Sequence, residues 1–188
     1  MKRSFFNVAK NPWWALLPSV SLIWHSIYTV KYLHPHYLFF VCYSANLFLI
    51  LGILFRSALL LGTGFGWSLI GFPLWFYAAY LNSDWEISAI CFHLFATIVG
   101  AMAMRSFRLP KHTFLFAILI AFVLQFAARC FTDESLNINA AFRVYEGWEG
   151  LFSNYSIYTI VMLIGFGAFF YSLTVINNLF IWKSDETD

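Results

Sequence analysis

Long apolar segments separated by short polar clusters occupy nearly all of the 188 residues. Each segment is close to the roughly 20 residues that a helix needs to cross a bilayer core about 30 Å thick. The pattern therefore predicts an all-α, polytopic membrane protein with six transmembrane helices in one domain, residues 1–188. The predicted spans are residues 13–33, 37–55, 57–81, 86–104, 113–131 and 155–182.

Arg56 separates the second and third apolar segments, which would otherwise be continuous. A single helix from Tyr37 to Tyr80 would be about 65 Å long at 1.5 Å per residue. Because this is too long for one crossing, we expect a tight turn near Arg56.

The composition agrees with this pattern, since 61% of residues are hydrophobic, 22% are aromatic and 11% are charged. These fractions lie far from those of soluble globular domains. The first apolar segment is long enough to span, and a Lys-Tyr-Leu-His-Pro-His run at residues 31–36 follows it instead of a small-residue cleavage site. We therefore expect it to remain as a helix and not to act as a cleaved signal. The net charge of +2 is spread along the loops, which excludes a nucleic-acid partner.

Basic residues predict the orientation, because short cytoplasmic loops carry an excess of Lys and Arg. A cytoplasmic N-terminus places eight basic residues inside: Lys2, Arg3, Lys10, Arg56, Arg105, Arg108, Lys111 and Lys183. It leaves three outside: Lys31, Arg129 and Arg143. The count favours both termini in the cytoplasm of a multi-pass protein of the plasma (inner) membrane, with membrane lipid as its surroundings.

The outer segment between the last two spans is polar but carries apolar and aromatic residues at intervals. Residues 134–152 are compatible with a short helix lying in the interface and capped by Asp133 or Ser135. A connecting loop is an equally good interpretation.

Three polar side chains from different spans lie at one predicted depth, roughly 9–12 Å below the outer boundary at 1.5 Å per residue. They are His25, His93 and Gln125. Such residues are costly in hydrocarbon and usually face the bundle interior or a water-filled cavity. Each alone is compatible with a hydrogen bond between helices, but their common level predicts a small polar pocket that opens outward.

The second span brings further candidates to this level, namely Ser44 and Asn46, with Cys42 just above them. A neutral imidazole could take a proton from a hydroxyl or thiol, so we predict a catalytic role for the two histidines with Ser44 or Cys42 as the nucleophile.

Amide groups could complete such a site by binding a developing oxyanion, and Asn46 and Gln125 are the predicted binding residues. No carboxylate lies at the same depth, although Asp84 and Glu86 stand just above the fourth span. Two histidines fall short of the three protein ligands usual for catalytic zinc, so no metal is assigned and the cofactor stays unknown.

The run GWSLIGFPLWFYAAYLNSD at residues 66–84, followed by an apolar span with a central His93, resembles the middle of the YwaF-type six-helix membrane proteins. The resemblance covers roughly residues 40–105. It implies acyl-transfer or hydrolytic activity on lipids, with His93 as the base and a nucleophile from residues 42–46.

Two other functions remain open. The chain could be a small-solute or metal-binding membrane subunit of a transporter, with Trp24, Trp67, Trp75 and Tyr77 lining the pocket. It could also be an accessory or immunity-type interaction protein that has a membrane-protein partner and no catalytic site, with the polar layer only setting helix register.

Overall fold

The computed structural model describes residue 8 and residues 11–83, 85–145 and 147–181, and all regular secondary structure in these residues is helical. The all-helical class and the presence of six long helices are confirmed. The six are α1 (Leu16–Tyr32), α2 (Val41–Leu54), α3 (Ala58–Asn82), α4 (Ile87–Met104), α5 (Thr113–Phe131) and α6 (Tyr155–Ile176).

Four of the helices are long and apolar enough to cross a membrane: α3, α4, α5 and α6, the last counted with the π-helical turn η5 (Asn177–Ile181) that extends it. Helices α1 and α2 have 17 and 14 residues, or about 26 and 21 Å at 1.5 Å per residue. Each follows a 3-10 helix that starts at a proline, η1 (Pro12–Ala15) and η2 (Pro35–Phe39). Proline favours the first turn of a helix, so the first two predicted spans each divide into a 3-10 turn and an α-helix.

The α2–α3 connection is the tight turn expected near Arg56. Arg56 has a φ of 54°, and the Ser57 amide donates to the Gly52 carbonyl oxygen at 2.9 Å. This pattern is that of a helix ending on a left-handed residue. Ser57 then caps α3 by accepting a hydrogen bond from the Leu60 amide at 3.4 Å.

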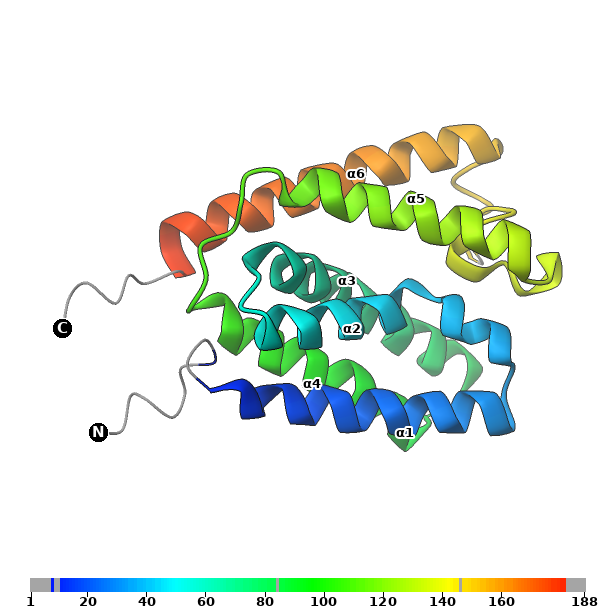
Figure 1. Cartoon of the computed structure of the whole chain (residues 1–188). Coiled ribbons are helices and arrows are strands. Elements are labelled where there is room, and N and C mark those ends of the chain that lie inside the picture. The colour runs from blue at the N-terminus through cyan, green and yellow to red at the C-terminus, as the bar shows by residue number, and fades with distance from the viewer. Residues whose placement is uncertain (1–7, 9–10, 84, 146, 182–188) are drawn as a thin grey trace.

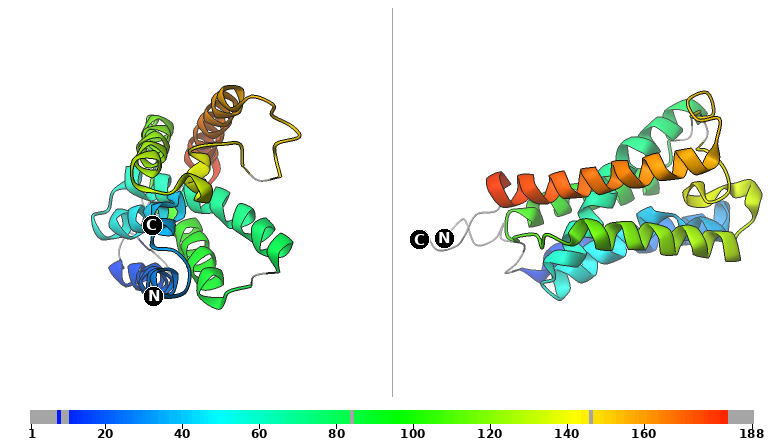
Figure 2. Two further views of the ribbon diagram at one scale, coloured as in Figure 1. Left: turned by 90° about the vertical axis from the view of Figure 1, so that its right-hand side faces the viewer. Right: turned by 90° about the horizontal axis from the view of Figure 1, so that it is seen from above.

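Helices α1 to α4 pack as a four-helix bundle, and α5 and α6 lie side by side as a hairpin along one side of it (Figures 1 and 2). Helix α3 contacts both parts, since it packs against α2, α4, α5 and α6. Helix α1 begins and α6 ends at the same end of the molecule (Figure 1). We call this end the terminal end, and we call the opposite end, which carries the α5–α6 connection, the loop end.

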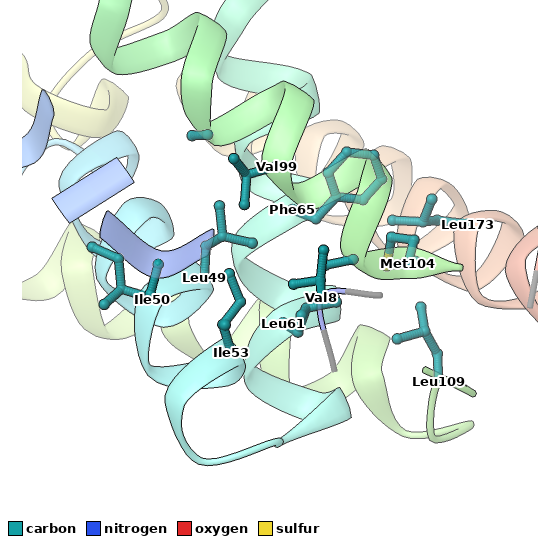
Figure 3. Packing of buried hydrophobic residues seen from close by; sticks show 13 residues of the cluster. Val8, Leu49, Ile50, Ile53, Leu61, Phe65, Val99, Met104, Leu109 and Leu173 are labelled. Atoms are coloured by element: carbon teal, nitrogen blue, oxygen red, sulfur yellow. The ribbon is translucent and has the colours of Figure 1, made fainter. Parts of the chain in front are cut away.

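The main hydrophobic core lies toward the terminal end, where side chains from α2, α3, α4 and α6 meet (Figure 3). Close packing depends on Gly52 in α2, since a Cβ atom there would lie 2.6 Å from the Leu61 backbone nitrogen. The largest side chains of this core are Val8, Leu49, Ile50, Ile53, Leu61, Phe65, Val99, Met104, Leu109 and Leu173.

Two consecutive asparagines at the end of α6 hold the α4–α5 connection at the terminal end. Asn178 accepts from the Leu109 amide at 2.8 Å and donates to the Leu109 carbonyl at 2.9 Å. Asn177 donates to the Phe107 carbonyl at 2.8 Å. The end of α6 is therefore tied to the α4–α5 connection by hydrogen bonds from side chains to the backbone as well as by apolar packing.

The segment predicted as either an interfacial helix over 134–152 or a loop is a loop in its described residues. It contains only two 3-10 turns, η3 (Glu134–Leu136) and η4 (Ile138–Ala140). Asn137, Asn139 and Ala140 have φ values of 43°, 55° and 50°. A right-handed helix cannot continue through such residues. Asp133 does cap η3, because its carboxylate accepts from the Ser135 amide at 2.8 Å.

Candidate functional site

A cavity of about 370 Å³ lies toward the loop end, between the α1–α4 bundle and the α5–α6 hairpin. All six helices contribute to its wall, and the α5–α6 loop covers it through Asn139, Ala140, Tyr145 and Trp148. The wall is largely apolar and rich in aromatic rings. Twelve Phe, Tyr and Trp side chains line it: Tyr28, Tyr37, Phe40, Tyr43, Trp67, Trp75, Phe92, Phe122, Tyr145, Trp148, Tyr158 and Phe166.

Glu86 stands at the start of α4 and caps the helix. Its carboxylate accepts hydrogen bonds from the Ser88 amide at 2.8 Å and the Ala89 amide at 2.6 Å. Unpaired amides and the helix dipole both favour a negative group at this position. Glu86 also lines the cavity, so the cap places a carboxylate in the cavity wall.

Ser88 links this carboxylate to His25. The Ser88 hydroxyl donates to Glu86 Oε2, and His25 Nδ1 lies 2.9 Å from Ser88 Oγ and 3.6 Å from Glu86 Oε2. Because the hydroxyl proton points to Glu86, its oxygen is left to accept from a protonated Nδ1. The hydrogen-bond network thus assigns the tautomer of His25 that keeps the lone pair on Nε2.

Aromatic packing holds the His25 ring in place. The ring stacks on Tyr43 with centroids 5.6 Å apart and contacts Phe92 at 4.8 Å. The Tyr43 hydroxyl in turn lies 2.5 Å from Thr29 Oγ1. His25 is therefore fixed by stacking on its faces and by Ser88 at its edge.

His93 lies in the same wall but is held differently. Its ring stacks on Trp75 with centroids 5.1 Å apart and an interplanar angle of 18°. Within the described part of the chain, neither ring nitrogen of His93 has a hydrogen-bond partner, although the residue is 5% exposed.

The two predicted nucleophiles fall in different places. Cys42 lines the cavity and packs on Gly71, where a Cβ atom would lie 2.9 Å from the sulfur. Ser44 is half-buried and is not part of the cavity wall. Successive helical residues are about 100° apart, so positions 42 and 44 face different directions.

The two predicted amide ligands also differ from expectation. Asn46 lies behind the wall at 1% exposure, where its Nδ2 donates to the Cys42 carbonyl at 3.2 Å. Gln125 lines the cavity, but its Nε2 donates to the Ala140 carbonyl at 3.0 Å. Both amide nitrogens are therefore bonded to the backbone of the protein itself.

Hydrogen bonds from several side chains hold the α5–α6 loop over the cavity. The Tyr155 hydroxyl lies 2.8 Å from both the Ala140 and the Ala141 carbonyl oxygens and shares its single proton between them. Arg129 Nε donates to the Ala141 carbonyl at 2.5 Å. Asn139 reaches the bundle, accepting from the Val41 amide at 2.9 Å and donating to the Phe39 carbonyl at 2.8 Å. The loop thus joins the hairpin to the start of α2.

Glu86 and Ser88 are the site residues that the sequence analysis missed. Counting residues along the fourth span places Glu86 above the polar layer, and no role was predicted for Ser88. The signal was local, since an acid two residues before a serine at the start of an apolar helix is typical of a capping position.

In the described residues, no three His, Cys, Asp or Glu side chains are grouped so that they could hold a metal ion. No protein-family model matches the chain, and neither does any curated protein or solved structure.

Proposed function

We propose that this chain is a multi-pass membrane protein that binds one lipid-like molecule in the cavity at the loop end. The apolar, outward-facing residues of the hairpin support the membrane setting. On α5, Leu115, Leu119 and Phe126 are 58%, 56% and 70% exposed. Water disfavours so much exposed apolar surface, whereas acyl chains would cover it at no cost.

The proposed orientation has both termini in the cytoplasm of the plasma (inner) membrane. The α2–α3 turn and the α4–α5 connection lie at the terminal end and carry Arg56, Arg105, Arg108 and Lys111. Short cytoplasmic loops are enriched in such residues. In this orientation the cavity lies on the extracytoplasmic side.

The observation that carries the proposal is the contrast between one polar wall and an otherwise apolar cavity. His25, Glu86 and His93 gather on the bundle side, and aromatic and aliphatic side chains form most of the remainder, which also includes Gln125 and Asn139. The volume lies within the range of about 300–1,000 Å³ typical of small-molecule sites. An amphiphile with one polar group and an apolar chain matches both parts.

Native mass spectrometry of the protein purified in a mild detergent tests this proposal. Ala121 lines the cavity and Leu119 lies on the outer face of the same helix. We expect a retained lipid-like mass on the wild type and on Leu119→Trp, and its loss from Ala121→Trp because the indole fills the cavity. Equal retention by the two variants would place the bound lipid on the outer surface and remove the proposal.

A second candidate function, hydrolysis or acyl transfer on a lipid ester, is favoured by the Glu86–Ser88–His25 chain. This chain orients the imidazole and leaves Nε2 as a proton acceptor, as a general base requires. The proposed base is therefore His25, whereas the YwaF-type resemblance implies His93. Either water or the Cys42 thiol would attack the ester carbonyl.

Turnover of a lipid ester by the purified protein tests this second function. We expect His25→Ala to lose at least 100-fold in rate, as is typical when a general base is removed. Ser44→Ala should keep full rate because Ser44 is outside the cavity wall. Cys42→Ala separates thiol from water attack, and a His25→Ala variant with unchanged turnover would exclude this chemistry.

A further inference from the structure

The charges in the cavity wall indicate which kind of head group a bound amphiphile carries. An inference about the head group rests on the lipid-binding function proposed above. Among the described lining residues Glu86 is the one that carries a formal charge, and neither Lys nor Arg is present. Arg129, the basic residue of α5, donates to the Ala141 carbonyl and to the Tyr155 hydroxyl. An anionic head group would therefore meet a carboxylate and no compensating cation in a poorly hydrated site.

The negative charge of Glu86 is stabilised but not neutralised. Its described hydrogen-bond donors are the Ser88 amide, the Ser88 hydroxyl and the Ala89 amide, all of which are uncharged. The His25 imidazole reaches the carboxylate mainly through Ser88 and needs no positive charge to donate from Nδ1. The side chain of Glu86 is 16% exposed, so the carboxylate field extends into the cavity.

Aromatic rings line the same cavity wall as this carboxylate, next to the two histidines. Tyr28 and Tyr43 stack near His25 at centroid distances of 6.5 and 5.6 Å, and Trp75 stacks on His93 at 5.1 Å. All three line the cavity. The faces of such rings attract ammonium groups, and they do so most strongly where water is excluded. A carboxylate and aromatic rings in one cavity wall are the groups that recognise substituted ammonium ions.

We infer that the cavity binds an amphiphile with a positively charged ammonium head group, which lies between Glu86 and the aromatic rings while the chain occupies the apolar part. The head group would interact with the carboxylate and the ring faces together. The aliphatic wall on α5 and α6, which includes Leu124, Met162 and Leu163, would then contact the chain.

A matched set of probes tests the inference on the whole protein in maltoside micelles, whose uncharged head groups add no surface charge. Dodecyltrimethylammonium is the cationic probe, and dodecyldimethylamine oxide is nearly the same size and uncharged at pH 8. Tetramethylammonium has the same head group without the chain. We expect titration calorimetry to show at least tenfold tighter binding of the cationic amphiphile than of either other probe.

The Glu86→Gln variant removes the charge and keeps an oxygen that can cap α4. It should reduce the preference for the cationic amphiphile over the amine oxide to less than threefold. Glu134→Gln is the matched control, because Glu134 is an exposed acid at the loop end that does not line the cavity. Its preference should equal that of the wild type.

Each remaining outcome overturns a defined part of the inference. Equal binding of the cationic amphiphile and the amine oxide to the wild type would remove the ammonium assignment and leave the lipid-binding function intact. A preference that persists in Glu86→Gln would exclude Glu86 as the group that recognises the ammonium ion, and would also leave the lipid-binding function intact. Tetramethylammonium binding as tightly as the amphiphile would assign the site to a small cation, and binding of neither amphiphile would remove the proposed function itself.

Discussion

The Ser88 hydroxyl connects the Glu86 carboxylate to the His25 imidazole, and the position of Ser88 at the start of α4 places it between them. Glu86 caps the helix through two backbone amides, so the carboxylate is held independently of the serine side chain. His25 is held by ring stacking on Tyr43 and by a tilted ring contact with Phe92, which do not involve Glu86 or Ser88. The hydroxyl therefore sets which ring nitrogen of His25 carries the proton, and it does not set where the ring lies.

Ser88→Ala is accordingly expected to change the tautomer of His25 without displacing the ring. In the wild type, nitrogen-15 NMR of labelled histidine should show His25 with its proton on Nδ1, and in Ser88→Ala both tautomers should be populated. A His25→Gln variant assigns the signal among the five histidines. Ser44→Ala is the control, and identical His25 spectra in wild type and Ser88→Ala would contradict the assigned hydrogen-bond direction.

At the scale of elements, the turn between α2 and α3 contains an arginine where glycine is favoured. Arg56 has a φ of 54°, a conformation that costs an L-residue roughly 1 kcal/mol relative to glycine. We therefore expect Arg56→Gly to stabilise the protein by about 1 kcal/mol, measured by denaturant unfolding in detergent. Arg56→Ala removes the same charge but keeps the strain, so a gain of equal size in both variants would show that charge is responsible.

The hydrogen bonds from Asn178 to Leu109 give a second prediction for the connection between elements. Leu109 is 2% exposed, so Asn178→Ala would leave its amide and carbonyl buried without these partners. We expect a loss of about 1–3 kcal/mol in unfolding free energy. Asn82→Ala is the matched control, because among the described residues its exposed amide bonds only to Ala78 one turn earlier. An equal loss in both variants would contradict the assigned role.

The predicted site depended on depth along each helix, and depth alone does not give direction. Cys42 and Ser44 were placed at nearly the same level, yet only Cys42 lines the cavity because the two residues differ in direction around the helix axis. Gln125 also lines the cavity, but its side-chain amide donates to the Ala140 carbonyl. That partner lies in a loop in which three non-glycine residues have positive φ values, and the path of the loop depends on contacts between distant segments that no local pattern encodes.

The six helices were predictable because segment length and apolarity together determine them, and these are local properties of the chain. The division of the first two segments into 3-10 and α parts also had a local signal, since Pro12 and Pro35 each stand at the start of a turn. The Glu86–Ser88–His25 chain joins His25 on α1 to Ser88 on α4, which are 63 residues apart in sequence. It forms only when each helix is rotated about its axis so that these side chains face each other. Packing of that kind follows from the assembled bundle and not from either helix alone.

For the whole molecule, the orientation decides which compartment supplies the ligand, and it can be measured without knowing that ligand. Ser135 lies at the loop end and Lys111 in the α4–α5 connection at the terminal end, and both are exposed. In a background with the three cysteines replaced by Ala, a membrane-impermeant thiol reagent should label Ser135→Cys in intact cells. It should label Lys111→Cys only after the cells are permeabilised, because Arg56, Arg105 and Arg108 remain at that end and favour a cytoplasmic location. The reverse pattern would place the cavity on the cytoplasmic side, and protection of both positions in intact cells would place the protein in an internal membrane.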